Sequence, residues 1–201
     1  MIPAEAFEPI LTELRRRPLE LNMCRNTAGE GRSQAFGVVN RRSCPPDYSR
    51  QCWSRPLLYK LLLEFGEKYV DVSFNAITLN QNYKAAPHYD KNNSGQSFLV
   101  AFGDFSGGQL EILEEGEDKG IYDIRHTPIK RDFSKLLHCV KEWEGERYSL
   151  VYYNFKHPRW EINLPPPSVR EVDGKLRFFR GEEMVKDGLP HPLKGRKKSG
   201  S

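Results

Sequence analysis

The sequence predicts a mainly β protein with helices on its N-terminal side. After Tyr69, short apolar runs rich in aromatic and β-branched residues follow one another, and no long helical pattern separates them. Glycine- and asparagine-rich turns stand between these runs. This pattern is typical of a β-sandwich or a barrel. The length of 201 residues fits one domain with some appended structure.

Two N-terminal segments predict helices. Within residues 3–17, apolar side chains recur at three- and four-residue spacing: Phe7, Ile10, Leu11 and Leu14. Pro9 lies inside this segment, which leaves open a helix that starts only there. A second helix is expected to begin at Pro56, because proline suits a first helical turn, and to end near Gly66.

Strands are expected along most of the remaining chain. The predicted strands are residues 35–39, 74–83, 97–103, 109–113, 120–125, 147–155 and 175–179. Residues 92–95 and 104–108 have the composition of turns. We expect three regions, namely an N-terminal helical and irregular support region (1–68), a β core (69–165) and a C-terminal extension with a basic tail (166–201).

The charge of the chain is nearly balanced, with a formal net charge of +4, so the total predicts no acidic partner. Basic residues cluster at 15–17, at 41–42 and in the tail. The tail residues are Lys194, Arg196, Lys197 and Lys198. These clusters could contact the phosphates of a nucleic acid, and solvated surface charge is the alternative.

The four cysteines show no close paired spacing: Cys24, Cys44, Cys52 and Cys139. We interpret them as reduced, mostly structural thiols, with a zinc site built from the first three as the alternative. No apolar run approaches the roughly twenty residues that span a bilayer, and residues 1–4 do not resemble a secretory signal. We expect a soluble intracellular monomer, for which the nucleus is one location to consider.

The candidate metal site consists of His88, Asp90 and His138. Two histidines and one carboxylate are the ligand set that holds a mononuclear non-haem Fe(II) on one face and leaves the opposite face open. The His88-Tyr89-Asp90 tripeptide alone is weak support, since a surface histidine beside a solvated aspartate is common. It follows a predicted strand, however, and alternate residues of an extended segment point to one face.

Arg147 adds a second feature to this site. It lies nine residues after His138, at the start of an apolar strand where a charged side chain needs a partner. The far carboxylate of a dicarboxylic co-substrate could be that partner, through a bidentate pair with the guanidinium. Three other histidines fit this pattern less well: His126, His157 and His191.

Several segments resemble the Fe(II)/2-oxoglutarate-dependent dioxygenase superfamily. They are residues 79–83, 88–93, 107–110, 137–140 and 145–151. The resemblance spans residues 74–155 and implies a double-stranded β-helix, of the jelly-roll or cupin kind, with the metal between two sheets. Residues 88–95, taken with 103–110, are most similar to the TET and base-J-binding-protein branch. Members of that branch oxidise the methyl group of 5-methylcytosine or thymine in nucleic acid.

The resemblance also implies roles for individual residues. His88, Asp90 and His138 would be the iron ligands, and Arg147 would bind the distal carboxylate of 2-oxoglutarate. Further residues are expected at the co-substrate: Ser149, and one of Asn80, Asn82 and Tyr83. The implied reaction uses Fe(II), O2 and 2-oxoglutarate to hydroxylate a C–H bond, and it releases succinate and CO2.

The substrate site is expected beside the metal motif, at Tyr89, Lys91 and Asn93. Asn93 could approach a polar edge of the substrate, and a turn residue is the alternative. A base in duplex DNA must be flipped out and stacked in a pocket. The aromatic candidates for stacking, which otherwise belong to the core, are Tyr89, Phe98, Phe102 and Phe105. The same chemistry on a protein side chain such as proline or on a small molecule, and a non-catalytic metal-binding module, are the alternative functions.

Overall fold

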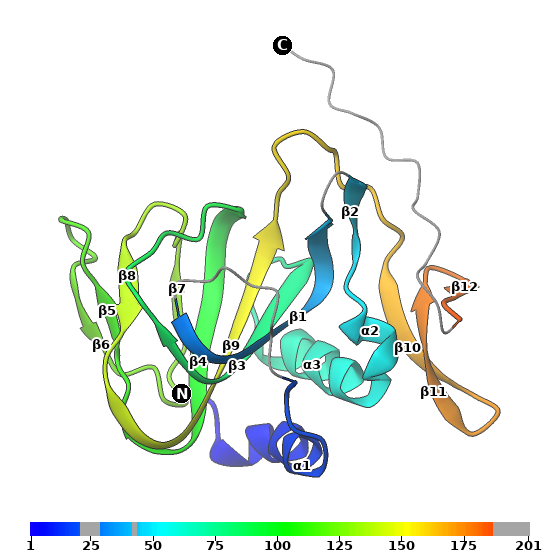
Figure 1. Cartoon of the computed structure of the whole chain (residues 1–201), viewed down its shortest axis with the longest axis horizontal. Helices are drawn as coiled ribbons and strands as arrows, with labels where there is room; N and C mark the ends of the chain where they lie inside the picture. Colours follow the sequence, from blue (N-terminus) through cyan, green and yellow to red (C-terminus); the bar gives the residue numbers. More distant parts are fainter. Residues whose placement is uncertain (21–28, 42–43, 187–201) are drawn as a thin grey trace.

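The computed structural model describes residues 1–20, 29–41 and 44–186 (Figure 1). The helices are η1 (Ala4–Phe7), α1 (Glu8–Arg16), α2 (Gln51–Ser54) and α3 (Pro56–Tyr69). The first strands are β1 (Gly29–Arg41), β2 (Cys44–Tyr48), β3 (Ala76–Ala85), β4 (Asn93–Gly107), β5 (Leu110–Ile112) and β6 (Gly120–Tyr122). The remaining strands are β7 (Ile129–Arg131), β8 (His138–Val140), β9 (Trp143–Phe155), β10 (Pro167–Val172), β11 (Lys175–Arg180) and β12 (Glu183–Met184).

The strands form three antiparallel sheets. The main sheet has the order β2-β1-β3-β9-β4-β7, the small sheet β6-β5-β8 and the C-terminal sheet β10-β11-β12. In Figure 1 the small sheet and the C-terminal sheet lie at opposite ends of the view. The chain is thus mainly β with flanking helices, as predicted, and its main and small sheets face each other as in a jelly roll.

Strand alternation gives the main sheet two different faces. Along β9, Tyr148, Leu150 and Tyr152 are buried in the core that the sheet shares with α1 and α3. The intervening residues point to the opposite face, where Val151 packs against the second core. That second core lies between the main and small sheets: Leu99, Ala101, Phe105, Leu110, Ile112, Ile124, Ile129 and Phe133. One apolar layer therefore joins the main sheet to the helices, and the other joins it to the small sheet.

The second helix extends beyond its predicted end. α3 begins at Pro56 as expected, but it continues through Gly66 to Tyr69. A Cβ atom on Gly66 would lie 2.7 Å from the Phe74 ring and 2.9 Å from the Tyr152 ring. The glycine is therefore required for close packing of the helix on the sheet, and it does not terminate the helix.

The predicted turns at residues 92–95 and 104–108 are mostly strand, which corrects the sequence-based assignment. Asn93 already pairs with Phe155, and β4 continues to pair with β9 as far as Gly107 and Trp143. Glycines at positive φ within the strand permit this, because a Cβ on Gly103 would lie 2.4 Å from the carbonyl oxygen of Glu146.

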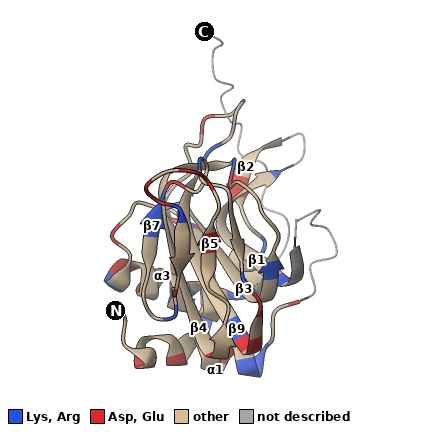
Figure 2. Ribbon diagram, turned by 90° about the vertical axis from the view of Figure 1, so that its left-hand side faces the viewer, with Lys and Arg blue, Asp and Glu red and all other residues tan. Residues whose placement is uncertain are grey.

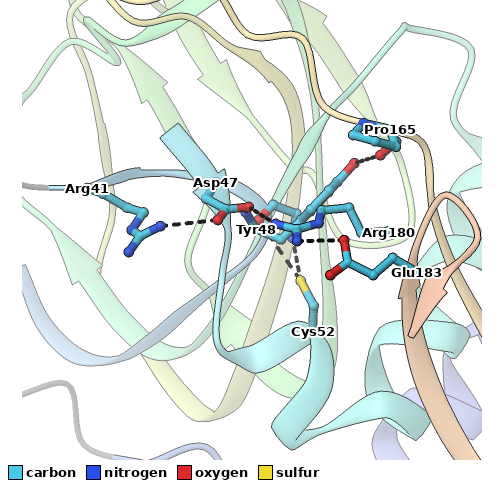
Figure 3. Close-up of polar contacts among 8 residues, drawn as sticks. Arg41, Asp47, Tyr48, Cys52, Pro165, Arg180 and Glu183 are labelled. Atoms are coloured by element: carbon cyan, nitrogen blue, oxygen red, sulfur yellow. Dashed lines mark hydrogen bonds and ion pairs between the residues drawn. The ribbon is translucent and has the colours of Figure 1, made fainter. Parts of the chain in front are cut away.

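The C-terminal sheet packs on the same core as the N-terminal helices. Phe178 of β11 is buried, with its ring centroid 5.3 Å from that of Tyr48 and 5.8 Å from that of Tyr59. A buried ion pair between Asp47 of β2 and Arg180 of β11 adds a polar connection (Figure 3). The division into regions 1–68, 69–165 and 166–201 stays a prediction. In the described parts of the chain, no helix has both the length and the apolarity needed to cross a membrane.

Candidate metal centre

His88, Asp90 and His138 come together although fifty residues separate the first histidine from the second. One potential ligand atom from each lies within 4.8 Å of the others. Among the residues that the structure describes, this is the one group of three or more histidine, cysteine or acidic side chains with such proximity. Two imidazoles and one carboxylate form the donor set expected of a non-haem Fe(II) site.

Two backbone hydrogen bonds place His88 and His138 opposite each other on neighbouring segments. The His88 amide donates to the His138 carbonyl at 3.0 Å, and the His138 amide donates to the His88 carbonyl at 3.1 Å. The ring centroids lie 4.3 Å apart as a result. The Asp90 amide donates to the Phe133 carbonyl at 3.0 Å, which holds the third residue on the same segment pair.

Both imidazoles are fixed in the tautomer that a metal ligand needs. His88 Nδ1 lies 2.7 Å from the Ala86 carbonyl oxygen, and His138 Nδ1 lies 2.8 Å from that of Leu136. A carbonyl oxygen can only accept, so each Nδ1 carries the proton. Each Nε2 then keeps its lone pair for a cation.

The carboxylate of Asp90 is also held in place. Asn93 Nδ2 donates to Asp90 Oδ2 at 3.2 Å and to Ser97 Oγ at 3.1 Å, while the Asn93 amide donates to the Asp90 carbonyl at 2.9 Å. Asp90 Oδ1 lies 3.4 Å from His88 Nε2. One carboxylate oxygen is therefore bound by the protein, and the other faces the histidines.

The two histidines differ in their electrostatic surroundings. The contact of His88 with Asp90 raises the pKa of His88, whereas burial lowers the pKa of His138. A divalent cation would take the lone pair of each Nε2, and the Asp90 carboxylate would balance part of the positive charge of the cation.

Arg147 lies in the same cavity as the three candidate ligands. The cavity has a volume of about 790 Å³, and its wall includes Arg147, Ser149 and Val151 of β9. These residues share one face of the strand because alternate positions point the same way. The spacing Arg-x-Ser therefore puts a guanidinium and a hydroxyl on the inner face of the main sheet.

The guanidinium of Arg147 is buried, and no described carboxylate is its partner. Its side chain is 2% exposed, and its Nε donates to the Gly108 carbonyl at 3.1 Å. Burial lowers the pKa of Arg147 to about 10, so the group remains cationic at neutral pH. Among the described residues no acidic side chain forms an ion pair with it. An unpaired buried cation is costly, and an anionic ligand in the cavity would remove that cost.

Gly108 leaves room for this arginine. Its φ is +67°, and a Cβ atom there would lie 2.8 Å from both Cδ and Nε of Arg147. The Gly107-Gly108 pair thus turns the chain after β4 and lets the Arg147 side chain pass close to the backbone.

The other predicted co-substrate residues divide into two groups. Asn80 and Tyr83 line the cavity, and Asn80 Nδ2 donates to the hydroxyl of Ser149 at 3.1 Å. Asn82 is not part of the cavity wall, and its Oδ1 accepts from the backbone amide of Arg147 at 2.8 Å. Of the three alternatives, Asn80 and Tyr83 therefore stay candidates for co-substrate contact, while Asn82 holds the strand that carries Arg147.

The predicted substrate residues Tyr89, Lys91 and Asn93 all lie at the cavity. Tyr89 is 37% exposed, and its hydroxyl donates to Glu114 Oε2 at 2.5 Å. The other aromatic candidates belong to the cores: Phe98, Phe102 and Phe105. Asn93 is buried beneath Asp90, where it contacts a candidate ligand, and its contact with a substrate stays a prediction.

The sequence matches no family model, and no curated protein matches it either. Solved structures do match. NgTET1 in complex with 5mC DNA has a TM-score of 0.54 at 15% identity, covering 77% of this chain and 69% of that one. A Pseudomonas putida prolyl-4-hydroxylase (TM-score 0.47, 16% identity) covers 78% and 89%, and OsALKBH1 (0.44, 11%) covers 76% and 99%.

The fold is that of the Fe(II)/2-oxoglutarate oxygenases. The match to NgTET1 and the grouped His-Asp-His side chains both support this assignment. The oxygenase fold explains why the three candidate ligands and Arg147 share one cavity, since the cavity lies between the main and small sheets.

The described cysteines form no candidate metal site. Cys52 is buried in the core and its Sγ accepts from the Gly37 amide at 3.1 Å, while burial raises its pKa to about 12. Cys44 and Cys139 are free thiols, and Cys24 lies outside the described residues. No described cysteine belongs to a metal-like group, so the zinc alternative has no structural support there.

The basic cluster residues that the structure describes form ion pairs with neighbouring acids. Around α1, three contacts join basic and acidic side chains: Arg15–Glu8 at 3.7 Å, Arg16–Glu13 at 2.8 Å and Arg17–Glu20 at 3.9 Å. Arg41 pairs with Asp47 at 3.1 Å, and the tail cluster lies outside the described residues. In Figure 2 basic and acidic residues are interspersed along the ribbon.

Several residues of the site had no signal in the sequence. The carbonyl groups of Ala86 and Leu136 belong to residues whose side chains have no role in the contact, so composition cannot reveal them. Glu114 is one of several acidic residues in its segment, and only the fold brings it beside Tyr89. The spacing of residues in the sequence indicates candidate ligands, but it does not indicate the groups that orient them.

Proposed function

We propose that this protein is an Fe(II)- and 2-oxoglutarate-dependent dioxygenase. His88, Asp90 and His138 would hold the iron, and Arg147 would bind the distal carboxylate of 2-oxoglutarate. The observation that carries the proposal is the shared cavity, which holds three convergent ligand atoms and a buried guanidinium without a described acidic partner. A dicarboxylic co-substrate that chelates the metal at one end would place its other carboxylate at such a cation.

The iron and its co-substrate would supply the oxidising chemistry for hydroxylation of a C–H bond. One oxygen atom of O2 enters the substrate, the other enters succinate, and CO2 is released. The protein's own groups would orient the reactants. The Ala86 and Leu136 carbonyls would hold the proton of each imidazole at Nδ1 and leave Nε2 for the metal. Asn93 would hold one oxygen of Asp90, and Arg147 with Ser149 would fix the co-substrate.

We propose the methyl group of a nucleobase, in 5-methylcytosine or thymine, as the hydroxylated position. The match to NgTET1, solved in complex with 5mC DNA, supports this choice. The cavity also carries Tyr89, an exposed ring beside the candidate ligands on which a flipped base could stack. Lys91 at the same rim could contact a phosphate.

A protein side chain or a small molecule is the second candidate substrate. The ion pairs around α1 favour it, because Arg15, Arg16 and Arg17 each have an acidic neighbour and present less uncompensated charge to phosphates.

A turnover assay decides between these proposals. Protein with Fe(II), 2-oxoglutarate and O2 would be offered methylated DNA, RNA or a proline peptide, and succinate and product mass would be measured. We expect succinate together with the gain of one oxygen on a DNA nucleoside. His88→Ala and Asp90→Ala should abolish both, while Asp71→Ala, which removes an exposed aspartate paired with Lys130, should not. Full turnover in the first two variants would refute the iron assignment.

A further inference from the structure

Glu114 connects the two chain segments that carry the candidate metal ligands. It lies just after β5, and its Oε2 accepts two hydrogen bonds. The Tyr89 hydroxyl donates to it at 2.5 Å, and the Leu137 backbone amide donates at 3.3 Å. Tyr89 is the central residue between His88 and Asp90, and Leu137 directly precedes His138. One carboxylate oxygen therefore bridges both segments.

The Leu137 end of this bridge is part of the structure that orients His138. The Leu113 amide donates to the Leu137 carbonyl at 2.8 Å, so the backbone beside Glu114 is itself paired with that segment. The preceding carbonyl, of Leu136, holds His138 Nδ1. A displacement of Leu137 would thus change the direction of the His138 ring.

The charge of Glu114 has no other described use. Among the described residues, no lysine or arginine forms an ion pair with Glu114, whereas its neighbour Glu115 pairs with Lys119 at 2.5 Å. Among the described residues, both hydrogen-bond donors to Glu114 come from the segments that carry the candidate ligands. A carboxylate with this pair of partners is well suited to orienting those segments, because charged hydrogen bonds are stronger than neutral ones.

We infer that Glu114 is a positioning residue of the metal site. Through Tyr89 and Leu137 it holds the His88–Asp90 tripeptide and the His138 segment at the separation that lets three ligand atoms meet. This inference rests on the proposed function, because it assigns a task to Glu114 only if His88, Asp90 and His138 bind a metal. It adds a residue that does not line the cavity and that a ligand motif cannot identify.

Binding of Co(II), used as the probe ion, to the full chain tests the inference by isothermal titration. Groups that orient metal ligands typically contribute about 10- to 100-fold to metal affinity. We expect Glu114→Ala to raise the Kd for Co(II) by about tenfold, at the lower end of that range. Glu114→Gln retains an acceptor oxygen but loses the charge, so its Kd should lie between those of the wild type and Glu114→Ala. Tyr89→Phe removes one of the two donors and should have an intermediate effect.

The double variant and a matched control separate positioning from general damage. Because Tyr89 acts through Glu114, the Tyr89→Phe/Glu114→Ala protein should bind Co(II) no more weakly than Glu114→Ala alone. Glu115→Ala removes the same charge one residue away and should leave the Kd unchanged. If Glu114→Ala fails to fold, Tyr89→Phe and Glu114→Gln still measure the bridge.

The possible outcomes are distinct. Wild-type protein that binds Co(II), with loss on His88→Ala, supports the metal site, and a wild-type Kd in Glu114→Ala or Tyr89→Phe would then overturn only the role of Glu114. Wild-type protein that does not bind Co(II) would overturn the proposed function and this inference together.

Discussion

The described protein groups around Arg147 compensate its buried positive charge only in part. Arg147 is buried and cationic, its Nε bonds to a carbonyl, and the rings of Phe105 and Trp143 lie within 6 Å of its guanidinium carbon, at 5.6 Å and 5.8 Å. Aromatic faces and one carbonyl stabilise a cation only in part. A carboxylate from a ligand would complete the set.

Replacing Arg147 by glutamine should weaken binding of 2-oxoglutarate to the Co(II)-loaded protein. Hydrogen bonds to charged groups contribute about 1.5–3 kcal/mol, so we expect the Kd for 2-oxoglutarate to rise by about 10- to 100-fold. The Kd for Co(II) itself should not change, because Arg147 is not a candidate ligand. Titration calorimetry measures both constants.

Arg125→Gln is the control for this prediction. Arg125 also lies over the Phe105 ring, at 5.5 Å, but it is exposed and does not line the cavity. Its removal should leave the Kd for 2-oxoglutarate unchanged. An Arg147→Gln protein that binds 2-oxoglutarate as tightly as wild type would exclude the carboxylate contact.

The sequence predicted which candidate site residues come together at the cavity, but it did not predict the groups that hold them there. The group of His88, Asp90 and His138 and the cavity position of Arg147 follow from spacing, because strand alternation is regular. The substrate contact of Asn93 stays a prediction, whereas the contact of its side-chain amide with Asp90 was not predicted. Such contacts depend on which loop returns beside the motif, and that is a property of the whole fold.

Among the elements, α3 shows how packing overrides a local signal. Gly66 is a common helix terminator in sequence terms, yet here it lets α3 approach the Phe74 and Tyr152 rings. We expect Gly66→Ala to lower the free energy of unfolding by about 1 kcal/mol or more. Overpacking typically costs about 1–3 kcal/mol, and the better helix propensity of alanine returns less than about 1 kcal/mol.

Urea unfolding of Gly66→Ala beside Glu67→Ala measures this effect. Glu67 is exposed on the next position of the same helix, so its replacement should change the unfolding free energy by less than about 0.5 kcal/mol. A Gly66→Ala protein more stable than wild type would show that the two rings move aside at no cost.

The attachment of β11 to β2 depends on a buried ion pair. Figure 3 shows Asp47 between Arg41 and Arg180, with Glu183 on the far side of Arg180. Asp47 is 1% exposed and Arg180 4% exposed. We expect Arg180→Met to lower the free energy of unfolding by about 3 kcal/mol, because it leaves the Asp47 charge buried with one partner fewer.

Arg170→Met is the matched control on the same C-terminal sheet. Arg170 pairs with Glu182 at 2.9 Å, but both side chains are exposed, and such pairs contribute about 0–1 kcal/mol. Chemical denaturation of both variants gives the comparison. Equal effects of the two substitutions would mean that Asp47 and Arg180 are not coupled in the folded protein.

One physical reason explains why the sequence did not predict some of the strands. β2, β7, β8, β10 and β12 all lie at the edges of their sheets. Edge strands are often short or contain proline, as β2 and the first residue of β10 do. They therefore lack the apolar alternation that reveals a central strand. Every predicted strand has a counterpart, and those in the middle of the main sheet are longer than expected or equal in length.

Residues from two different sheets form the proposed site. Arg147 and Ser149 belong to β9 of the main sheet, while His138 belongs to β8 of the small sheet and pairs with His88. A metal with its co-substrate would therefore join both layers across the cavity. Neither sheet alone offers a complete site, which is why no single segment of the sequence shows the whole arrangement.

This division predicts synergy between metal and co-substrate in thermal stability. A ligand that binds the folded state raises the Tm, and two ligands that improve each other's binding raise it by more than the sum of their separate effects. We expect 2-oxoglutarate alone to shift the Tm little, Co(II) alone to raise it, and the two together to raise it by more than the sum of the separate shifts.

The variants test this prediction. Arg147→Gln should keep the Tm shift caused by Co(II) and lose the synergy, whereas His138→Ala should lose both. Strictly additive shifts in the wild-type protein would mean that the two ligands occupy independent sites, because a co-substrate held between Arg147 and the metal must couple them.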